Sequence, residues 1–168
     1  MSPRRLVLLR HAKAEHGLDV SDHDRPLTLV VRRQSSRVGV GLAEADLVPD
    51  VVQCSTSLRT RQTWELARAA LGDAQPAVTY AAELYDAGPD DLLALVRDVD
   101  AGAGVVLVVG HEPTMSRAAA ALAGPGSDDA VRTRVHLGVP TASWTVLAPG
   151  PWADLSRGSA RLLALHVP

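Results

Sequence analysis

The chain has 168 residues, which suits one domain and is too short for two ordinary domains, so we expect residues 1–168 to form a single domain. Its formal net charge of −2 argues against partners that need a basic surface, such as nucleic acid or an anionic membrane. Cys54 is the only cysteine, which excludes an intramolecular disulfide and a site with several cysteine ligands. The apolar runs are too short for a signal peptide or a membrane span, so the expected location is the cytoplasm.

Short apolar runs alternate with helical patterns along the chain. Six runs have the length and composition of strands, at residues 6–9, 51–54, 78–80, 105–109, 143–147 and 161–166. In four other segments apolar residues recur every three or four positions, as in helices with one inward face: residues 31–45, 57–71, 89–99 and 113–122. Residues 124–129 are expected to form a turn or loop. The alternation predicts an α/β protein whose mainly parallel sheet is covered by helices.

Two histidines directly follow buried strands of this predicted sheet. His11 comes after Arg10 at the exit of the first strand, and His111 comes after Gly110 at the exit of the run 105–109. Ligands of open α/β sheets bind outside the carboxyl ends of the strands, so these histidines face each other if their strands are neighbours. Two histidines and an arginine, with few carboxylate or cysteine ligands nearby, suit an anion better than a metal.

Arg59 follows the strand 51–54 and is expected in the first turn of a helix for which Ser57 is the N-cap. A helix N-terminus favours an anion, and a cation placed there is unfavourable unless an anion accompanies it. Each of these residues alone has a structural interpretation, because lone histidines after strands and lone arginines are usually structural or surface residues. Their combination favours an anion site, with His16 and His23 either at its rim or in solvent.

Four segments in a fixed order resemble the histidine phosphatase superfamily, which has the phosphoglycerate-mutase-like fold. The segments are Leu8-Leu9-Arg10-His11-Ala12, Asp24-Arg25-Pro26-Leu27-Thr28, Ser57-Leu58-Arg59-Thr60-Arg61-Gln62-Thr63 and Val109-Gly110-His111-Glu112-Pro113. The short chain and the Arg-Pro-Leu-Thr element resemble the SixA branch, which dephosphorylates phosphohistidine in proteins. The resemblance implies a three-layer α/β/α sandwich and a phosphate pocket made of Arg10, His11, Arg59 and His111.

The resemblance also implies a metal-independent phosphatase that needs no cofactor. Neutral His11 would attack phosphorus and carry a covalent phosphohistidine, while Arg10, Arg59 and a protonated His111 would bind the transferring group. The two guanidiniums should lower the pKa of His11. Many members of the family use a carboxylate as proton donor. Glu83 is the first candidate for that role and Asp86 the second, and a solvated loop carboxylate is an equal alternative for Glu83.

The expected substrate is a phosphorylated protein that carries phosphohistidine, or a small phosphate ester. A mutase or a sugar-phosphate phosphatase of the same fold is one alternative, which the short chain disfavours because mutases need more chain to enclose their substrate. A non-catalytic phosphate-binding module is the other alternative, and the intact nucleophile His11 argues against it.

Overall fold

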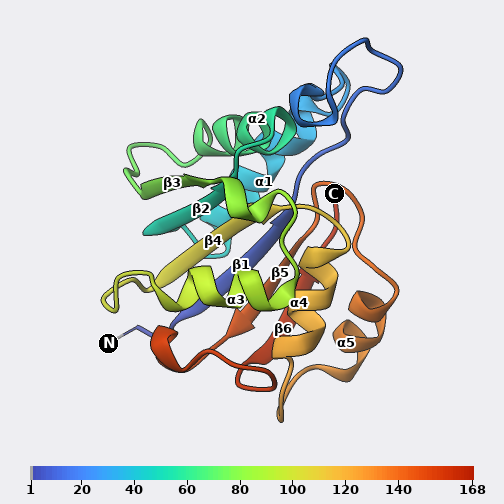
Figure 1. Ribbon diagram of the computed structural model, residues 1–168. Coiled ribbons are helices and arrows are strands. Elements are labelled where there is room, and N and C mark those ends of the chain that lie inside the picture. The colour runs from blue at the N-terminus through green and yellow to red at the C-terminus, as the bar shows by residue number, and fades with distance from the viewer. Residues whose placement is uncertain (1) are drawn as a thin grey trace.

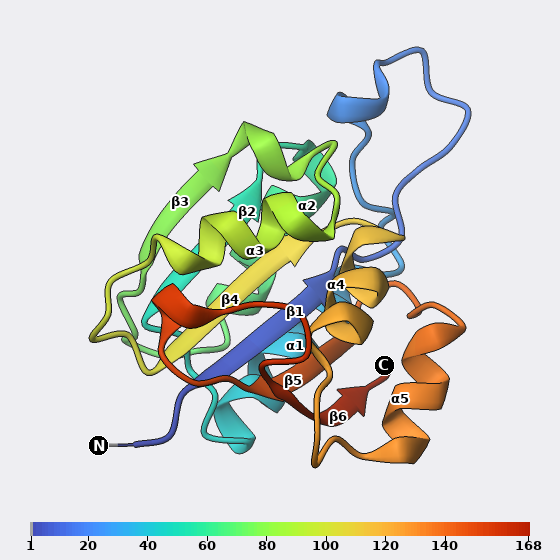
Figure 2. The same cartoon turned by 60° about the horizontal axis from the view of Figure 1, so that its bottom comes forward.

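A computed structural model describes residues 2–168 as a six-stranded sheet with helices on both faces (Figure 1, Figure 2). The strands are β1 (Arg5–Arg10), β2 (Val51–Ser55), β3 (Ala77–Ala81), β4 (Val105–Gly110), β5 (Trp144–Ala148) and β6 (Arg161–His166). Their order in the sheet is β3-β2-β4-β1-β5-β6. The first four in this order are parallel, and β5 runs antiparallel to both β1 and β6. The predicted α/β class and mainly parallel sheet are confirmed.

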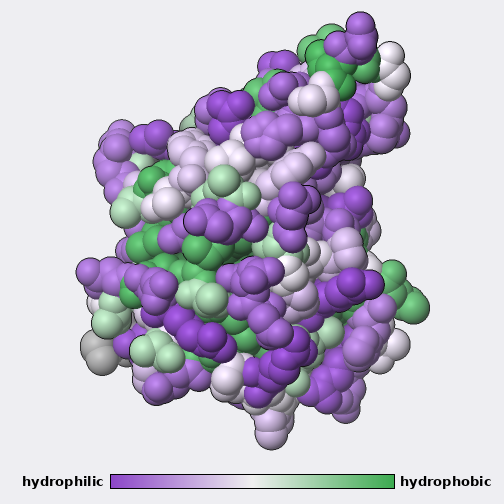
Figure 3. All heavy atoms as spheres, viewed as in Figure 1, coloured by the Kyte–Doolittle hydropathy of each residue, from purple (hydrophilic) through white to green (hydrophobic). Residues whose placement is uncertain are grey.

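The helices form the two outer layers. On one face lie α1 (Arg32–Glu44) and α2 (Leu58–Arg68), and on the other lie α3 (Pro89–Arg97), α4 (Thr114–Leu122) and α5 (Asp129–His136). Single turns of 3-10 helix occur at η1 (Asp22–Asp24), η2 (Ala82–Leu84) and η3 (Trp152–Asp154). In the space-filling view hydrophilic residues predominate, and a strip of hydrophobic surface shows between β3 and α3 (Figure 3).

The strand β1 shows why the central runs are apolar without alternation. Leu6 and Leu8 pack in the core beneath α3, α4 and α5, whereas Val7 and Leu9 pack in the core beneath α1 and α2. All four side chains are buried, because helices cover both faces of the strand. The apolar run therefore keeps β1 in the middle of the sheet. The carboxyl end of this strand is thus held rigidly, together with the residues that follow it.

The helix α5 was not expected from the sequence, which predicted only a turn at residues 124–129. Asp128 caps this helix, and its carboxylate accepts a hydrogen bond of 2.9 Å from the amide of Val131. Val135 is its one fully buried residue, so the segment carries too little apolar periodicity to be recognised as a helix. Within residues 2–168, none of the helices combines the length and hydrophobicity that crossing a membrane requires.

Candidate active site

The two histidines are brought together by the pairing of β1 with β4. The register places Arg10 opposite Gly110, so His11 and His111 leave the sheet side by side, and their ring centroids are 5.3 Å apart. The amide of His11 also donates a hydrogen bond of 3.0 Å to the carbonyl of Gly110. The predicted meeting of the histidines at the carboxyl ends of neighbouring strands is confirmed.

Arg59 enters the same site from the first turn of α2. Ser57 caps this helix by accepting from the amide of Thr60, as the sequence predicted. The Arg59 Nε lies 3.4 Å from His11 Nε2, and its Nη2 lies 3.4 Å from His111 Nδ1. Arg59 is only 6% exposed, so its charge is held inside the site.

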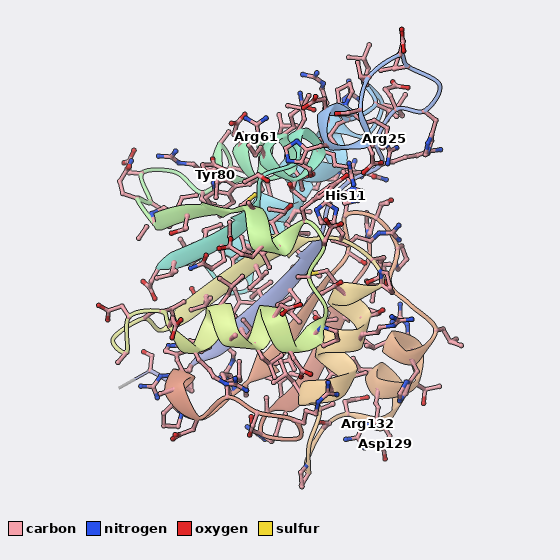
Figure 4. All side chains as sticks on the ribbon, viewed as in Figure 1. His11, Arg25, Arg61, Tyr80, Asp129 and Arg132 are labelled. Atoms are coloured by element: carbon pink, nitrogen blue, oxygen red, sulfur yellow. The ribbon has the colours of Figure 1, made fainter. Side chains whose placement is uncertain are left out.

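These side chains line a cavity of about 250 Å³ at the carboxyl edge of the sheet. The lining residues are Arg10, His11, Lys13, Ala14, His16, Arg25, Arg59, His111, Glu112 and Thr141. Among them arginine and lysine side chains outnumber the single carboxylate. Figure 4 shows His11 at the end of β1 and Arg25 in the loop beyond it. Within residues 2–168 no group of three or more His, Cys, Asp or Glu side chains is arranged to hold a metal ion. The lining suits a small anion with several oxygens.

The ring of His11 is fixed in one tautomer. Its Nδ1 lies 2.6 Å from the carbonyl oxygen of Ala12, so Nδ1–H donates and the lone pair remains on Nε2. The pKa of His11 is lowered to about 4, mainly by burial and in addition by the charges of Arg59 and Arg10, against the opposing effect of the Ala12 hydrogen bond. The direction predicted for this pKa is confirmed, although burial rather than the guanidiniums is its largest cause.

His111 is held between Ser55 and Arg59. Its Nε2 lies 2.8 Å from Ser55 Oγ, and its Nδ1 faces the donor Nη2 of Arg59, which assigns the hydrogen to Nε2. The pKa of His111 is lowered to about 3, mainly by burial and in addition by the neighbouring His11 and Arg59. The ring is therefore neutral in the protein without substrate, and a protonated His111 that binds the transferring group stays a prediction. A negative charge bound in the cavity raises this pKa, because it favours the charged imidazole.

Arg10 completes the predicted set at the end of β1. Its Nη1 donates a hydrogen bond of 2.7 Å to the carbonyl of Val139, in the segment before β5, and the side chain lines the cavity. Thr63 of α2 accepts a hydrogen bond of 3.0 Å from the amide of Ala12, which ties the turn after His11 to this helix. Elements from four parts of the chain thus hold Arg10, His11, Arg59 and His111 around one cavity.

The chain resembles proteins of known family over almost its whole length. A sequence profile described as the histidine phosphatase superfamily (branch 1) matches residues 6–88. An uncharacterised protein of Mycobacterium tuberculosis is 40% identical over 163 residues, which cover 95% of this chain and 99% of that protein. A structure from Nakamurella multipartitia, named for the phosphohistidine phosphatase SixA, is 37% identical with a TM-score of 0.85 and covers 100% of this chain and 98% of its own.

The chain belongs to the histidine phosphatase superfamily. A second SixA-named structure, from Agrobacterium tumefaciens, is 28% identical with a TM-score of 0.82, and each chain is covered in full. These similarities assign the chain to the SixA-type branch and confirm the phosphoglycerate-mutase-like fold.

Two residues of this histidine phosphatase were not singled out by sequence reasoning but contact the site. Asp22 in η1 bonds with Arg25 and Arg59, and Tyr85 after η2 donates a hydrogen bond to the Asp22 carboxylate. The ring of Tyr85 also meets that of His111 edge-on at a centroid distance of 5.5 Å. The Asp-Arg-Pro-Leu-Thr segment drew attention to the loop that holds Arg25, whereas no sequence pattern distinguishes Tyr85.

The predicted proton donors lie outside the cavity lining. Glu83 is exposed in η2, and Asp86 is exposed in the turn before α3. Their role as acids in this histidine phosphatase stays a prediction. His16 does line the cavity, and His23 Nε2 lies 2.9 Å from Thr56 Oγ1.

Proposed function

We propose that this histidine phosphatase hydrolyses phosphohistidine, with residues 1–168 acting as one catalytic domain that needs no metal. The observation that carries the proposal is the His11 ring, whose Nε2 lone pair is fixed by the bond from Nδ1–H to Ala12 and faces Arg59 in a cationic cavity. A low pKa keeps this nitrogen unprotonated at neutral pH.

The reaction has two steps. First, His11 Nε2 attacks phosphorus in line, the phosphorus–nitrogen bond of the substrate breaks, and the substrate imidazole, protonated from solvent on its other nitrogen, leaves as a neutral ring. Water then attacks phosphorus on His11, and inorganic phosphate leaves as the neutral ring is restored. Arg10, Arg59 and a His111 that gains its proton with the substrate stabilise the charge on the equatorial oxygens.

The hydrogen bonds of the one carboxylate in the cavity wall favour phosphohistidine over an alkyl phosphate ester as the substrate. Glu112 lines the cavity, but its two oxygens are engaged as acceptors of hydrogen bonds from the amides of Ser116 at 2.8 Å and Val139 at 3.2 Å. An alkoxide leaving group needs a positioned acid, whereas an imidazole leaves readily once its ring is protonated from solvent. The similarity to SixA-named structures points the same way. A phosphorylated protein of the cytoplasm is therefore the proposed substrate.

Covalent trapping tests this proposal. A peptide carrying ³²P-labelled phosphohistidine, quenched with alkali after brief incubation, should leave acid-labile label on the protein, which mass spectrometry locates on His11. His11→Ala should show no turnover, while His136→Ala, which alters an exposed histidine of α5 outside the cavity lining, should behave as wild type. Label on another residue, or turnover by His11→Ala, would refute the assignment. If the protein hydrolyses small phosphate esters but not the phosphohistidine peptide, phosphate esters replace phosphohistidine as the proposed substrate class.

A further inference from the structure

Asp22 binds both arginines that reach the cavity from outside the strands. Its backbone carbonyl accepts a hydrogen bond of 2.6 Å from Arg59 Nη1, and its Oδ2 accepts one of 3.1 Å from Arg59 Nη2. Its Oδ1 accepts from Arg25, at 2.9 Å from Nε and 2.7 Å from Nη2. The hydroxyl of Tyr85 also donates to Oδ2. One half-exposed aspartate therefore connects the loop after β1, the start of α2 and the turn after β3.

The contacts of Asp22 and the contacts that face the cavity use different edges of the Arg59 guanidinium. Nη1 and Nη2 form the end of the group, and both are bonded to Asp22. Nε and Nη2 form its side, and this side faces His11 Nε2 and His111 Nδ1 at 3.4 Å each. The planar group presents its donors in fixed directions, so holding the end determines where the side points.

We propose that Asp22 is a positioning residue that holds the end of Arg59 so that its side binds two oxygens of the transferring phosphoryl group, with Tyr85 anchoring the aspartate. The identity of the bound group rests on the proposed function. Because Asp22 binds the end of the guanidinium and not the edge that faces the cavity, it does not compete with the phosphoryl group for that edge. The Arg59 side chain is 7% exposed and that of Asp22 is 54% exposed, so the aspartate meets the buried cation from the solvent side.

The charge state of the aspartate agrees with this role. The hydrogen bond from Tyr85, followed by those from Arg25 and Arg59, holds the pKa of Asp22 well below its ordinary range, so the carboxylate is ionised at every pH at which the protein is assayed. Its partners are thereby fixed as donors, which keeps Arg59 in one orientation before substrate arrives.

The test compares Asp22→Asn with Asp24→Asn. Asp24 belongs to the same short helix and loses the same charge, but its carboxylate contacts Ser21 and His23 and not Arg59. Asp22→Asn should lower kcat for the phosphohistidine peptide about tenfold or more, because small misplacements of binding groups have effects of this size. Calorimetry should show weaker binding of tungstate, and the NMR signal of Arg59 Nε–H should broaden or shift. Asp24→Asn should match the wild type in all three measurements.

Tyr85→Phe provides a second variant that keeps the ring and removes only the anchoring hydroxyl. It should cause a smaller loss of kcat, and the double variant Asp22→Asn/Tyr85→Phe should lose no more than Asp22→Asn alone, since both changes release the same aspartate. Equal behaviour of Asp22→Asn and Asp24→Asn, or tighter tungstate binding and faster turnover in Asp22→Asn, would overturn the proposal. Tungstate affinity and the Arg59 signal do not depend on turnover, so failure of the wild type to hydrolyse phosphohistidine would refute the proposed function and leave this test intact.

Discussion

The titration of His11 provides a direct check of the environment of this proposed nucleophile. Burial, together with the charges of Arg59 and Arg10, lowers the pKa of His11 from 6.5 to about 4. At pH 5.5 a pKa of about 4 leaves roughly 97% of His11 neutral, whereas the ordinary value would leave roughly 9%. We therefore expect the ring to stay neutral, and able to attack phosphorus, throughout mildly acidic conditions.

The difference between the pKa of His11 in the folded protein and its ordinary value makes the free energy of unfolding depend on pH. In the unfolded chain His11 takes up a proton near pH 6.5, but in the folded protein it does so only near pH 4. Protons therefore favour the unfolded state within this window, and the stabilisation is complete above pH 6.5 and is lost as the pH falls toward 4. Between pH 7.5 and 4.5 the contribution of His11 to the free energy of unfolding should fall by about 2.5 kcal/mol.

Two measurements check these values. The NMR signal of the His11 ring, assigned by its absence in His11→Gln, should titrate with a midpoint near 4 in the folded protein and near 6.5 in urea. Urea unfolding at pH 7.5 and 4.5 should show a smaller loss of stability for His11→Gln than for wild type, by about 2.5 kcal/mol. A folded-state midpoint near 6.5, or the same pH dependence in both proteins, would refute the assigned effect of burial.

Three further outcomes are expected. Arg10→Ala and Arg59→Ala should each lower kcat on the order of a hundredfold with the circular dichroism spectrum unchanged; a rate near wild type would show that the arginine does not contact the transferring group. Activity should survive EDTA and be inhibited by vanadate, which mimics five-coordinate phosphorus, whereas chelator-sensitive activity restored by zinc or manganese would contradict the mechanism. Glu83→Gln should slow alkyl phosphate hydrolysis far more than phosphohistidine hydrolysis. Equal slowing would instead give Glu83 a role in orienting the pocket, and no effect would exclude it from the site.

The strands and the main pocket could be predicted because their signals are local. The unbroken apolar runs that end at Arg10 and Gly110 indicate strands buried on both faces, and the rule for parallel sheets then brings the following histidines together. Ser57 marked the start of α2 and thus the position of Arg59. These inferences needed only neighbouring residues and one general rule of topology.

The residues that contact the site from outside the cavity lining could not be predicted in this way. Asp22 and Tyr85 are 63 positions apart in the chain and meet through two irregular loops, whose sequences carry no periodicity. The low pKa of His111 in the protein without substrate was not predicted either, because it depends on how deeply the ring is buried, which only the three-dimensional structure provides.

The central position of β1 has a consequence for how the protein is made. Of the six strands β1 is synthesised first, yet its partners lie far downstream, with Arg5 paired to Val105 and Leu6 to Leu147. Until those partners are synthesised, Leu6 to Leu9 form an apolar segment with two open edges, of the kind that aggregates or binds chaperones. A nascent chain or fragment that stops before β4 therefore has His11 but no neighbouring strand to hold it, so we expect no phosphatase activity until β4 and His111 have been synthesised.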